Sequence, residues 1–268
     1  MKQRVISSLF GIILLILVLM GNQYVFDFVV TLITMTAVYE VINAVGLKEF
    51  RRMTAVALLM PPALMLTSYI STEYLSGVVF LFVAAFLLLM LFDHKRYIFE
   101  KAALFIAISL MISLSFLYVS LIRRLGNGNL DIWVLLIGCW ITDTCAYFTG
   151  YFAGKHKLAP EISPKKTIEG SIGGIIGVTV ILTAYAHIAA NILGNVSVNT
   201  LSAVITGLVC GVISQFGDLC ASIIKREHNI KDFGNIMPGH GGVMDRFDSF
   251  LFVAPVVYYI LKFSPIFY

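Results

Sequence analysis

The stretch Tyr74–Phe92, YLSGVVFLFVAAFLLLMLF, runs for nineteen residues without a charged side chain. About 20 apolar residues in a helix cross the roughly 30 Å hydrocarbon core of a bilayer. The whole 268-residue chain follows this pattern, because 59% of its residues are hydrophobic and only 13% are charged. Soluble domains carry about 25% charged residues. The sequence therefore predicts an all-α, polytopic integral membrane protein.

The apolar runs along the chain predict about nine transmembrane helices. The first follows Lys2 and Arg4 and lacks a clear small-residue cleavage site, so we interpret it as a retained helix and not as a signal peptide. The predicted spans are 5–20, 24–46, 53–70, 74–92, 100–121, 132–153, 170–193, 200–224 and 249–264. We divide them into an N-terminal region of five spans (1–121) and a C-terminal catalytic region of four spans (122–268).

The distribution of lysine and arginine predicts the orientation of these spans. With the N-terminus in the cytoplasm, all of the 19 basic residues except Arg123, Arg124 and Lys262 fall in cytoplasmic segments. Cytoplasmic loops carry such an excess of basic residues. The net charge of +4 therefore reflects an inner basic face toward anionic lipids or substrates, and not a nucleic-acid surface.

Acidic residues within two of the spans mark a candidate site. Asp143 and Asp218 each lie in an apolar run that leads into a long cytoplasmic loop. Ionisable residues inside a span cost about 2.5–3.5 kcal/mol on insertion scales and usually mark function. Ser214, Asp218, Ser222 and Lys225 share one helix face. A hydrogen-bonded stripe that seals a helix pair is the alternative for this face, and for Glu40 we favour a structural role.

The loop before the last span is dense in polar groups: PGHGGVMDRFDS, Pro238–Ser249. Its glycines permit positive φ and close approach of amides to phosphate oxygens. If the last helix begins here, Asp245 and Asp248 share a face, and hard carboxylate oxygens suit Mg²⁺. Nearby basic residues can neutralise phosphates. His240 is compatible with a general base, a metal ligand or an ordinary hydrogen-bonding group.

The earlier cytoplasmic loop contains SPKKTIEGSIGG, Ser163–Gly174. Ser163 and Pro164 resemble an N-cap followed by the first helical residue. This predicts that Lys165 and Lys166 lie at a helix N-terminus, which favours anions. The two overlapping GxxxG spacings that follow predict close helix packing.

Together these motifs resemble the phosphatidate cytidylyltransferase (CDP-diacylglycerol synthase) family. Its signature, S-x-x-K-R-x4-K-D-x-G followed by P-x-H-G-G-x-x-D-R-x-D, matches the segment from Ser222 to Asp248. Met237 stands where the family usually has Leu, Ile or Phe. The resemblance is specific in the C-terminal half, whereas the first 120 residues match only in hydropathy and span count.

The resemblance implies a reaction in which phosphatidic acid and CTP give CDP-diacylglycerol and pyrophosphate with Mg²⁺, as one or two ions. It implies an enzyme of the cell (inner) membrane whose site faces the cytoplasm. The predicted catalytic residues are Asp218, Lys225, Arg226, His240, Asp245, Arg246 and Asp248, of which Asp218, Asp245 and Asp248 are the predicted metal ligands. The predicted phosphate-binding and substrate-binding residues are Asp143, Ser163, Lys165, Lys166, Ser222, Lys231, Asp232, Gly241 and Gly242.

Two other functions remain open at this point. One is a related CTP-dependent transferase that acts on another lipid phosphate, such as an ether lipid. The other is an anion transporter, although the two halves of the sequence show no visible inverted repeat. The sequence is compatible with a homodimer but does not fix the oligomeric state.

Overall fold

The computed structural model describes residues 11, 13–237, 239 and 241–268. Residues 11 and 13–20 of the predicted first span are helical, and the earlier part of that span lies outside the described residues. The elements are α2 (Gln23–Ala44), α3 (Arg51–Ile70), η1 (Thr72–Tyr74), α4 (Leu75–Phe92), α5 (Phe99–Arg123), α6 (Gly128–Ala153), β1 (Lys157–Ala159), β2 (Ser163–Thr167), α7 (Ile168–Leu193), α8 (Thr200–Glu227), α9 (Met244–Phe247) and α10 (Phe250–Phe263).

The helices confirm the predicted all-α membrane architecture. Within the described residues, seven helical segments are long and apolar enough to cross a bilayer. They correspond to the second through eighth predicted spans, with ends that differ by a few residues. The ninth prediction, 249–264, corresponds to α10, which has only 14 residues. The predicted cytoplasmic position of the N-terminus stays a prediction.

The chain divides into two compact units. Unit 1 comprises Met1–Leu117 and His228–Phe247, and unit 2 comprises Tyr118–Glu227 and Asp248–Tyr268. The loop between α8 and α9 therefore belongs with the N-terminal helices, although it carries most of the C-terminal signature. The predicted functional boundary after residue 121 stays a prediction.

Unit 1 is built on sequential helix packing. α2 packs on α3, α3 packs on α4, and the short helix α9 packs on α2. Aromatic side chains fill the core beside α5, where Phe105 contacts the rings of Phe50 and Phe86. Both Phe86 and Phe105 are almost completely buried. Because an aromatic side chain buries a large apolar area, this cluster stabilises the unit against unfolding.

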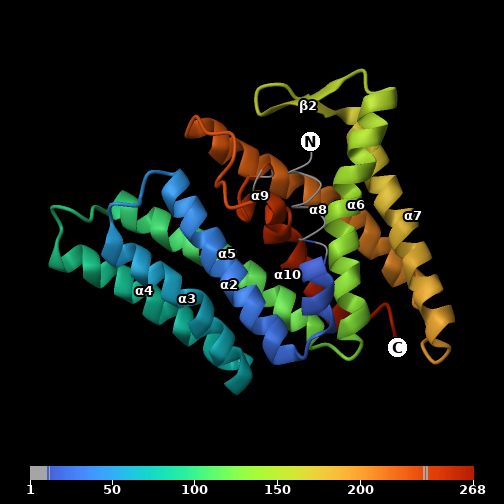
Figure 1. The fold of residues 1–268 in the computed structure, drawn as a ribbon, viewed down its shortest axis with the longest axis horizontal. Helices are drawn as coiled ribbons and strands as arrows, with labels where there is room; N and C mark the ends of the chain where they lie inside the picture. The colour runs from blue at the N-terminus through green and yellow to red at the C-terminus, as the bar shows by residue number, and fades with distance from the viewer. Residues whose placement is uncertain (1–10, 12, 238, 240) are drawn as a thin grey trace. The chain divides into compact units, whose positions relative to one another are not determined.

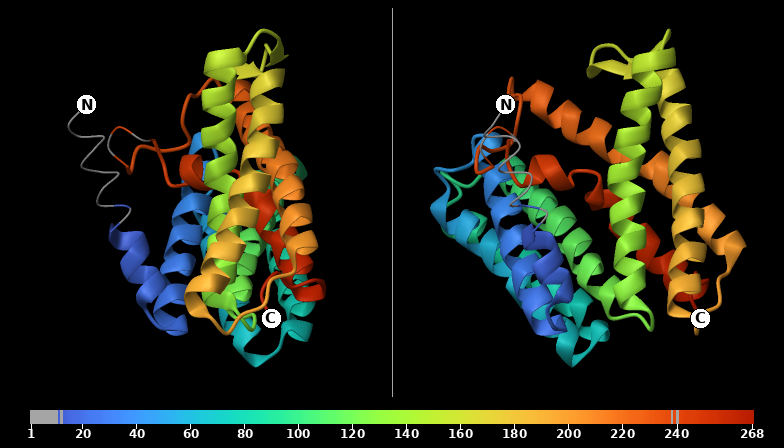
Figure 2. Two further views of the ribbon diagram at one scale, coloured as in Figure 1. Left: turned by 90° about the vertical axis from the view of Figure 1, so that its right-hand side faces the viewer. Right: turned by 45° about the vertical axis from the view of Figure 1, so that its right-hand side comes forward.

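Unit 2 is organised around the close pair α6 and α7, which lie side by side in Figure 1 and in both views of Figure 2. The predicted glycine packing is confirmed: a Cβ on Gly170 would lie 2.7 Å from the carbonyl oxygen of Ala146. α8 approaches α7 equally closely, and a Cβ on Gly207 would lie 2.6 Å from Cα of Thr179. The absence of side chains at these glycines thus lets the three backbones approach closely.

Candidate active site

A short hairpin precedes α7, in place of the predicted helix start. Ser163–Thr167 forms β2, which pairs antiparallel with β1. The helix begins four residues later than predicted because Thr167 is the N-cap, and its hydroxyl accepts the amide hydrogen of Gly170 at 3.1 Å. A Thr cap satisfies one of the unpaired amides of the first turn. The prediction that Lys165 and Lys166 sit on a helix N-terminus is therefore wrong, since both extend from a strand.

The hairpin is fixed to the first turn of α7 by Glu169. One oxygen of this carboxylate accepts the backbone amides of Lys155 at 3.0 Å and His156 at 3.2 Å. The other oxygen lies 2.6 Å from Nδ1 of His156. Hydrogen bonds to a carboxylate are stronger than neutral ones, so the base of the hairpin has a defined position beside α7.

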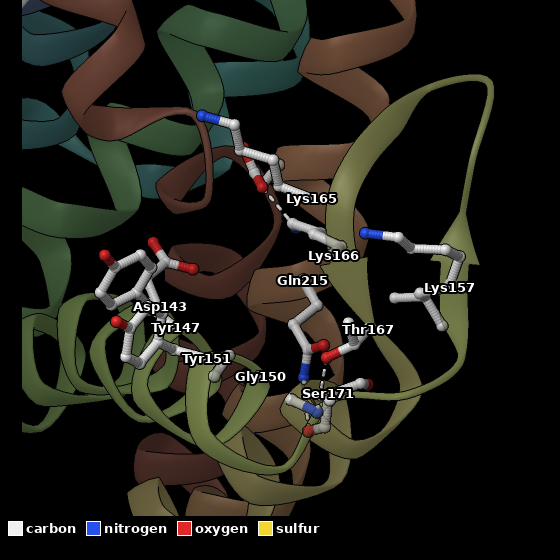
Figure 3. Close-up of a pocket in the computed structure, with 15 residues that line it drawn as sticks. Asp143, Tyr147, Gly150, Tyr151, Lys157, Lys165, Lys166, Thr167, Ser171 and Gln215 are labelled. Carbon is white, nitrogen blue, oxygen red and sulfur yellow. Dashed lines mark hydrogen bonds and ion pairs between the residues drawn. The ribbon is translucent and has the colours of Figure 1, made fainter.

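The hairpin and the helices α6, α7 and α8 enclose a cavity of about 570 Å³ (Figure 3). This volume lies within the range of about 300–1,000 Å³ that small-molecule sites occupy. The lining residues that carry polar side chains are Asp143, Tyr147, Tyr151, Lys157, Lys165, Lys166, Thr167, Ser171, Gln215 and Asp218. All of them belong to unit 2.

Charges of both signs meet in this cavity. The hairpin contributes three lysines, Lys157, Lys165 and Lys166, and the helices contribute Asp143 and Asp218. Lys166 forms an ion pair with Asp218, and the sequence places both among the predicted site residues. Lysine ammonium groups bind phosphates as point charges. The cavity can therefore hold a phosphorylated molecule beside carboxylates that attract a cation.

A second ion pair joins the end of α8 to the segment before α10. Nζ of Lys225 lies 3.9 Å from Oδ2 of Asp248, and the two side chains are only 13% and 10% exposed. Burial and the negative charge of Asp218 raise the pKa of Asp248 to about 7, and the charge of Lys225 opposes this shift. A carboxylate in such surroundings gains from an additional cation, because opposite charge favours its ionised form.

Asp245 and Asp248 do not share one helix, so that interpretation of their spacing is wrong. α9 ends at Phe247 and α10 begins at Phe250. Between them, the carboxylate of Asp248 accepts the amide hydrogen of Ser249 at 2.9 Å. Aspartate side chains commonly bond to nearby amides in this way and so compete with the helical ladder.

The carboxylates of unit 2 fit a magnesium ion whose remaining ligands come from water and substrate. Within either unit, the described residues contain no group of three or more His, Cys, Asp or Glu side chains arranged to hold a metal. Mg²⁺ commonly uses one or two carboxylates together with water and substrate phosphates. Asp218 and Asp248 supply two such carboxylates in unit 2. The role of Asp245, which belongs to unit 1, as a third metal ligand stays a prediction.

In unit 1, Asp245 organises the glycine-rich loop that the signature predicted. Its Oδ2 accepts the backbone amides of Phe233 at 2.8 Å and Gly242 at 3.0 Å. Of the three glycines predicted to permit positive φ, Gly239 and Gly241 adopt it, at +79° and +84°, whereas Gly242 does not. The carboxylate of Asp245 thus faces backbone amides, which fixes the local course of the loop.

Glu40 supports the same loop from α2. It is only 4% exposed, and its Oε2 accepts the amide hydrogen of Met244 at 2.9 Å. A Cβ on Gly234 or Gly242 would lie within 2.6 Å of a Glu40 carboxylate oxygen. The structural role that we favoured for Glu40 agrees with these contacts, since the carboxylate fills the space that the two glycines leave.

The other predicted residues occupy more open positions. On unit 2, Nε of Arg226 donates to the carbonyl of Ile162 in the hairpin turn at 3.4 Å, and Ser163 and Ser222 are half-buried. On unit 1, Lys231, Asp232 and Arg246 are exposed. His240 lies outside the described residues. The alternative interpretation of the polar face of α8 was a hydrogen-bonded stripe that seals a helix pair. It agrees with Ser214, whose hydroxyl donates to the carbonyl of Cys139 on α6 at 3.5 Å.

Several cavity residues were not predicted as site residues. Tyr147 and Tyr151 follow Asp143 at intervals of four on α6, and their rings stack with centroids 6.4 Å apart. That spacing places the two tyrosines on the same helix face as Asp143. The sequence alone could therefore have identified them as candidate site residues. Gln215 precedes Asp218 by three residues and gives the same signal. Lys157 carries no comparable signal, because the hairpin that directs it was not predicted.

Comparison with known proteins shows similarity over most of the chain. The family model described as "Cytidylyltransferase family" matches residues 2–264. A phosphatidate cytidylyltransferase of Bacillus subtilis is 32% identical over 267 residues, which is 97% of each chain. An enzyme of the same name from Staphylococcus saprophyticus is 30% identical over 63% of this chain and 62% of its own length. One from Synechocystis is 47% identical over 60 residues, or 22% of this chain and 20% of its own. The chain thus belongs to the cytidylyltransferase family.

Proposed function

We propose that this protein is a phosphatidate cytidylyltransferase that transfers CMP from CTP to phosphatidic acid. The products are CDP-diacylglycerol, a precursor in phospholipid biosynthesis, and pyrophosphate. The observation that carries this proposal is the cavity of unit 2, where three hairpin lysines face Asp143 and Asp218. The similarity over 97% of the B. subtilis enzyme supports the choice of substrates.

The reaction places particular demands on the protein. An oxygen of the phosphatidate phosphate attacks the α-phosphorus of CTP. The bond from that phosphorus to the oxygen bridging the α- and β-phosphates breaks, and pyrophosphate leaves with that oxygen. A phosphate monoester carries a charge of about −1.5 to −2 at pH 7, so the nucleophile is already ionised. The main obstacle is therefore the repulsion between two polyanions, and not removal of a proton.

The basic side chains around the cavity address this repulsion. Lys157, Lys165 and Lys166 line it, and they hold phosphate groups by charge and hydrogen bonding. Prearranged charges of this kind stabilise the transition state of phosphoryl transfer. Lys166 also balances the negative charge of Asp218 when no nucleotide is bound, which keeps the carboxylate ready for a cation.

Magnesium is the proposed cofactor, as one or two ions. Asp218 and Asp248 are the ligands that unit 2 offers, and Asp245 is the third ligand that the signature implies. When bound, Mg²⁺ neutralises phosphate charge and orients the reacting groups. Lys225, 3.9 Å from Asp248, holds that carboxylate in place from the end of α8.

The location of the site follows from the chemistry of the substrates. CTP is water-soluble and enters from the cytoplasm, whereas the lipid arrives laterally in the bilayer. We therefore propose that the protein resides in the cell membrane with the hairpin and the loop before α9 on the cytoplasmic side. The positions of the basic residues along the sequence support this orientation.

The purified protein in phospholipid nanodiscs provides the test. With CTP, Mg²⁺ and dioleoyl phosphatidate, we expect equal amounts of pyrophosphate and CDP-dioleoylglycerol, and no product when either substrate is omitted. Product with an archaeal-type ether phosphatidate but none with the diacyl lipid would favour the related transferase. No nucleotide turnover, together with anion uptake into proteoliposomes, would contradict the proposal and favour a transporter.

A further inference from the structure

One buried polar side chain in the cavity has no role in the charge balance described above. Gln215 on α8 is only 6% exposed, and it lines the cavity together with Asp218 and Ser171. In Figure 3 it lies between the lysine end of the cavity and Ser171. A buried amide in a membrane helix requires partners for its donors and its acceptor, so its hydrogen bonds indicate what it can bind.

Both amide hydrogens of Gln215 are already used. Its Nε2 donates to the carbonyl of Ser171 on α7 at 3.2 Å and to the carbonyl of Gly211 on α8 at 2.8 Å. Because two carbonyl acceptors surround this end of the amide, it must be the NH₂ end and not the oxygen. The orientation of the side chain is therefore fixed by the backbones of two helices.

The oxygen of the same amide remains available. Among the described residues, none donates a hydrogen bond to Oε1 of Gln215. In a cavity partly shielded from water, a ligand that donates a hydrogen bond to this oxygen satisfies the acceptor, so such a ligand is favoured. The cavity thus presents a fixed, uncharged acceptor in addition to the carboxylates of Asp143 and Asp218, whereas its lysines present only donors.

The two proposed substrates differ in what they can offer this acceptor. An ionised phosphatidate headgroup consists of phosphate and ester oxygens, which are acceptors only. The nucleoside of CTP carries donors, namely the amine at C4 of cytosine and the ribose hydroxyls. We propose that Oε1 of Gln215 accepts a hydrogen bond from the nucleoside of CTP, and that this residue places the nucleoside while the lysines hold the triphosphate.

This inference rests on the proposed function and adds a specificity-determining residue to it. If the donor is the cytosine amine, Gln215 also selects against uracil, which has a carbonyl oxygen at that position. Two acceptors facing each other leave both unpaired, and sites built around a specific hydrogen bond reject such analogues strongly. If the donor is a ribose hydroxyl, Gln215 distinguishes CTP from a deoxynucleotide instead.

The test compares three nucleotides in two proteins. CTP, its 4-deaminated pyrimidinone analogue and dCTP are titrated against the wild-type protein in phospholipid nanodiscs that contain no phosphatidate. The value of kcat/KM is then measured with dioleoyl phosphatidate. We expect one analogue to bind the wild type at least about tenfold more weakly than CTP. In the isosteric variant Gln215→Met, that ratio should fall to about one.

A matched control separates recognition from packing. Ser214 neighbours Gln215 on α8, is fully buried and bonds to a backbone carbonyl, but it does not line the cavity. Ser214→Ala should keep the wild-type ratio. If Gln215→Met does not fold, Gln215→Leu, which also removes the acceptor and suits a buried position in a membrane helix, should show the same loss of discrimination. Wild-type binding that is equal for all three nucleotides, or a ratio that Gln215→Met leaves unchanged, would overturn the inference. Absence of any CTP turnover by the wild type would instead contradict the proposed function.

Discussion

Lys166 on β2 and Asp218 on α8 form an ion pair, and both side chains line the same cavity. They are 23% and 26% exposed, so the pair is neither fully desolvated nor a surface contact. Because most of each side chain is shielded from water, loss of one partner leaves a charge that solvent compensates only in part. The pair therefore links β2 to α8, and it also places a cationic and an anionic group where a phosphate and a metal ion could bind.

Neutralising either member of this pair should lower activity strongly. We expect Lys166→Met and Asp218→Asn each to reduce kcat/KM at least about 100-fold, the scale seen when one charge-stabilising group is removed. Lys155→Met is the control, because Lys155 belongs to the same loop but does not line the cavity. If the pair were only structural, the double variant Lys166→Met with Asp218→Asn would recover activity, since no unpaired charge remains.

Asp248 should control the magnesium requirement. Replacing it with Asn keeps the shape but removes the charge that Mg²⁺ prefers. We expect the Mg²⁺ concentration for half-maximal activity to rise at least about tenfold, and chelation to abolish wild-type activity reversibly. Glu161→Gln, an exposed residue of the hairpin turn, should leave the titration unchanged. An unaltered Mg²⁺ titration in Asp248→Asn would exclude this carboxylate as a ligand.

Glu40 should stabilise the loop between α8 and α9. Its bond to the amide of Met244 is buried, and a buried group that loses its hydrogen-bond partner costs about 1–3 kcal/mol. Glu40→Ala should therefore increase protease cleavage within residues 228–247 and lower activity, whereas Glu40→Gln, which retains an acceptor, should have the smaller effect. Equal cleavage of all three proteins would show that the bond does not hold the loop.

The sequence predicted the helices better than it predicted the site, for physical reasons. Apolar runs report burial in lipid directly, so the spans differ from the helices by only a few residues. The turn at Ser163 was misassigned because Ser–Pro satisfies local capping rules, and only the pairing of β2 with β1 moves the helix start to Ile168. Asp218 and Lys225 were predicted because charges in or beside a span are costly, and the structure places Asp218 in the cavity and Lys225 beside Asp248. Gln215 was not found, because an uncharged amide adds little to that signal.

The contact between α7 and α8 should depend on the absence of a side chain at Gly207. A Cβ there would meet the backbone of Thr179 at 2.6 Å, and overpacking of this kind costs about 1–3 kcal/mol. Gly207→Ala should therefore lower the melting temperature measured in detergent. Gly77 in α4 has no atom within 4 Å of the position of a Cβ, so Gly77→Ala should raise stability by up to about 1 kcal/mol through helix propensity. Similar changes in melting temperature for both variants would show that α8 can move away from α7 without loss of stability.

The pH dependence should report the lipid and not a histidine. Because the phosphatidate phosphate is the nucleophile, kcat/KM should rise with pH as its second proton leaves, near pH 6. If Asp248 binds Mg²⁺ as proposed, the cation favours its ionised form, so we expect the pKa of Asp248 to lie below this range in the working enzyme. The rising limb should persist in His240→Ala, with a loss of activity well below the 10²–10⁴-fold typical of a general base.

A phosphonate analogue of phosphatidate, which has a higher second pKa, should move the rising limb to higher pH in both the wild type and His240→Ala. If the limb instead disappears in His240→Ala, or does not move with the phosphonate, the titrating group belongs to the protein and the proposed mechanism is wrong.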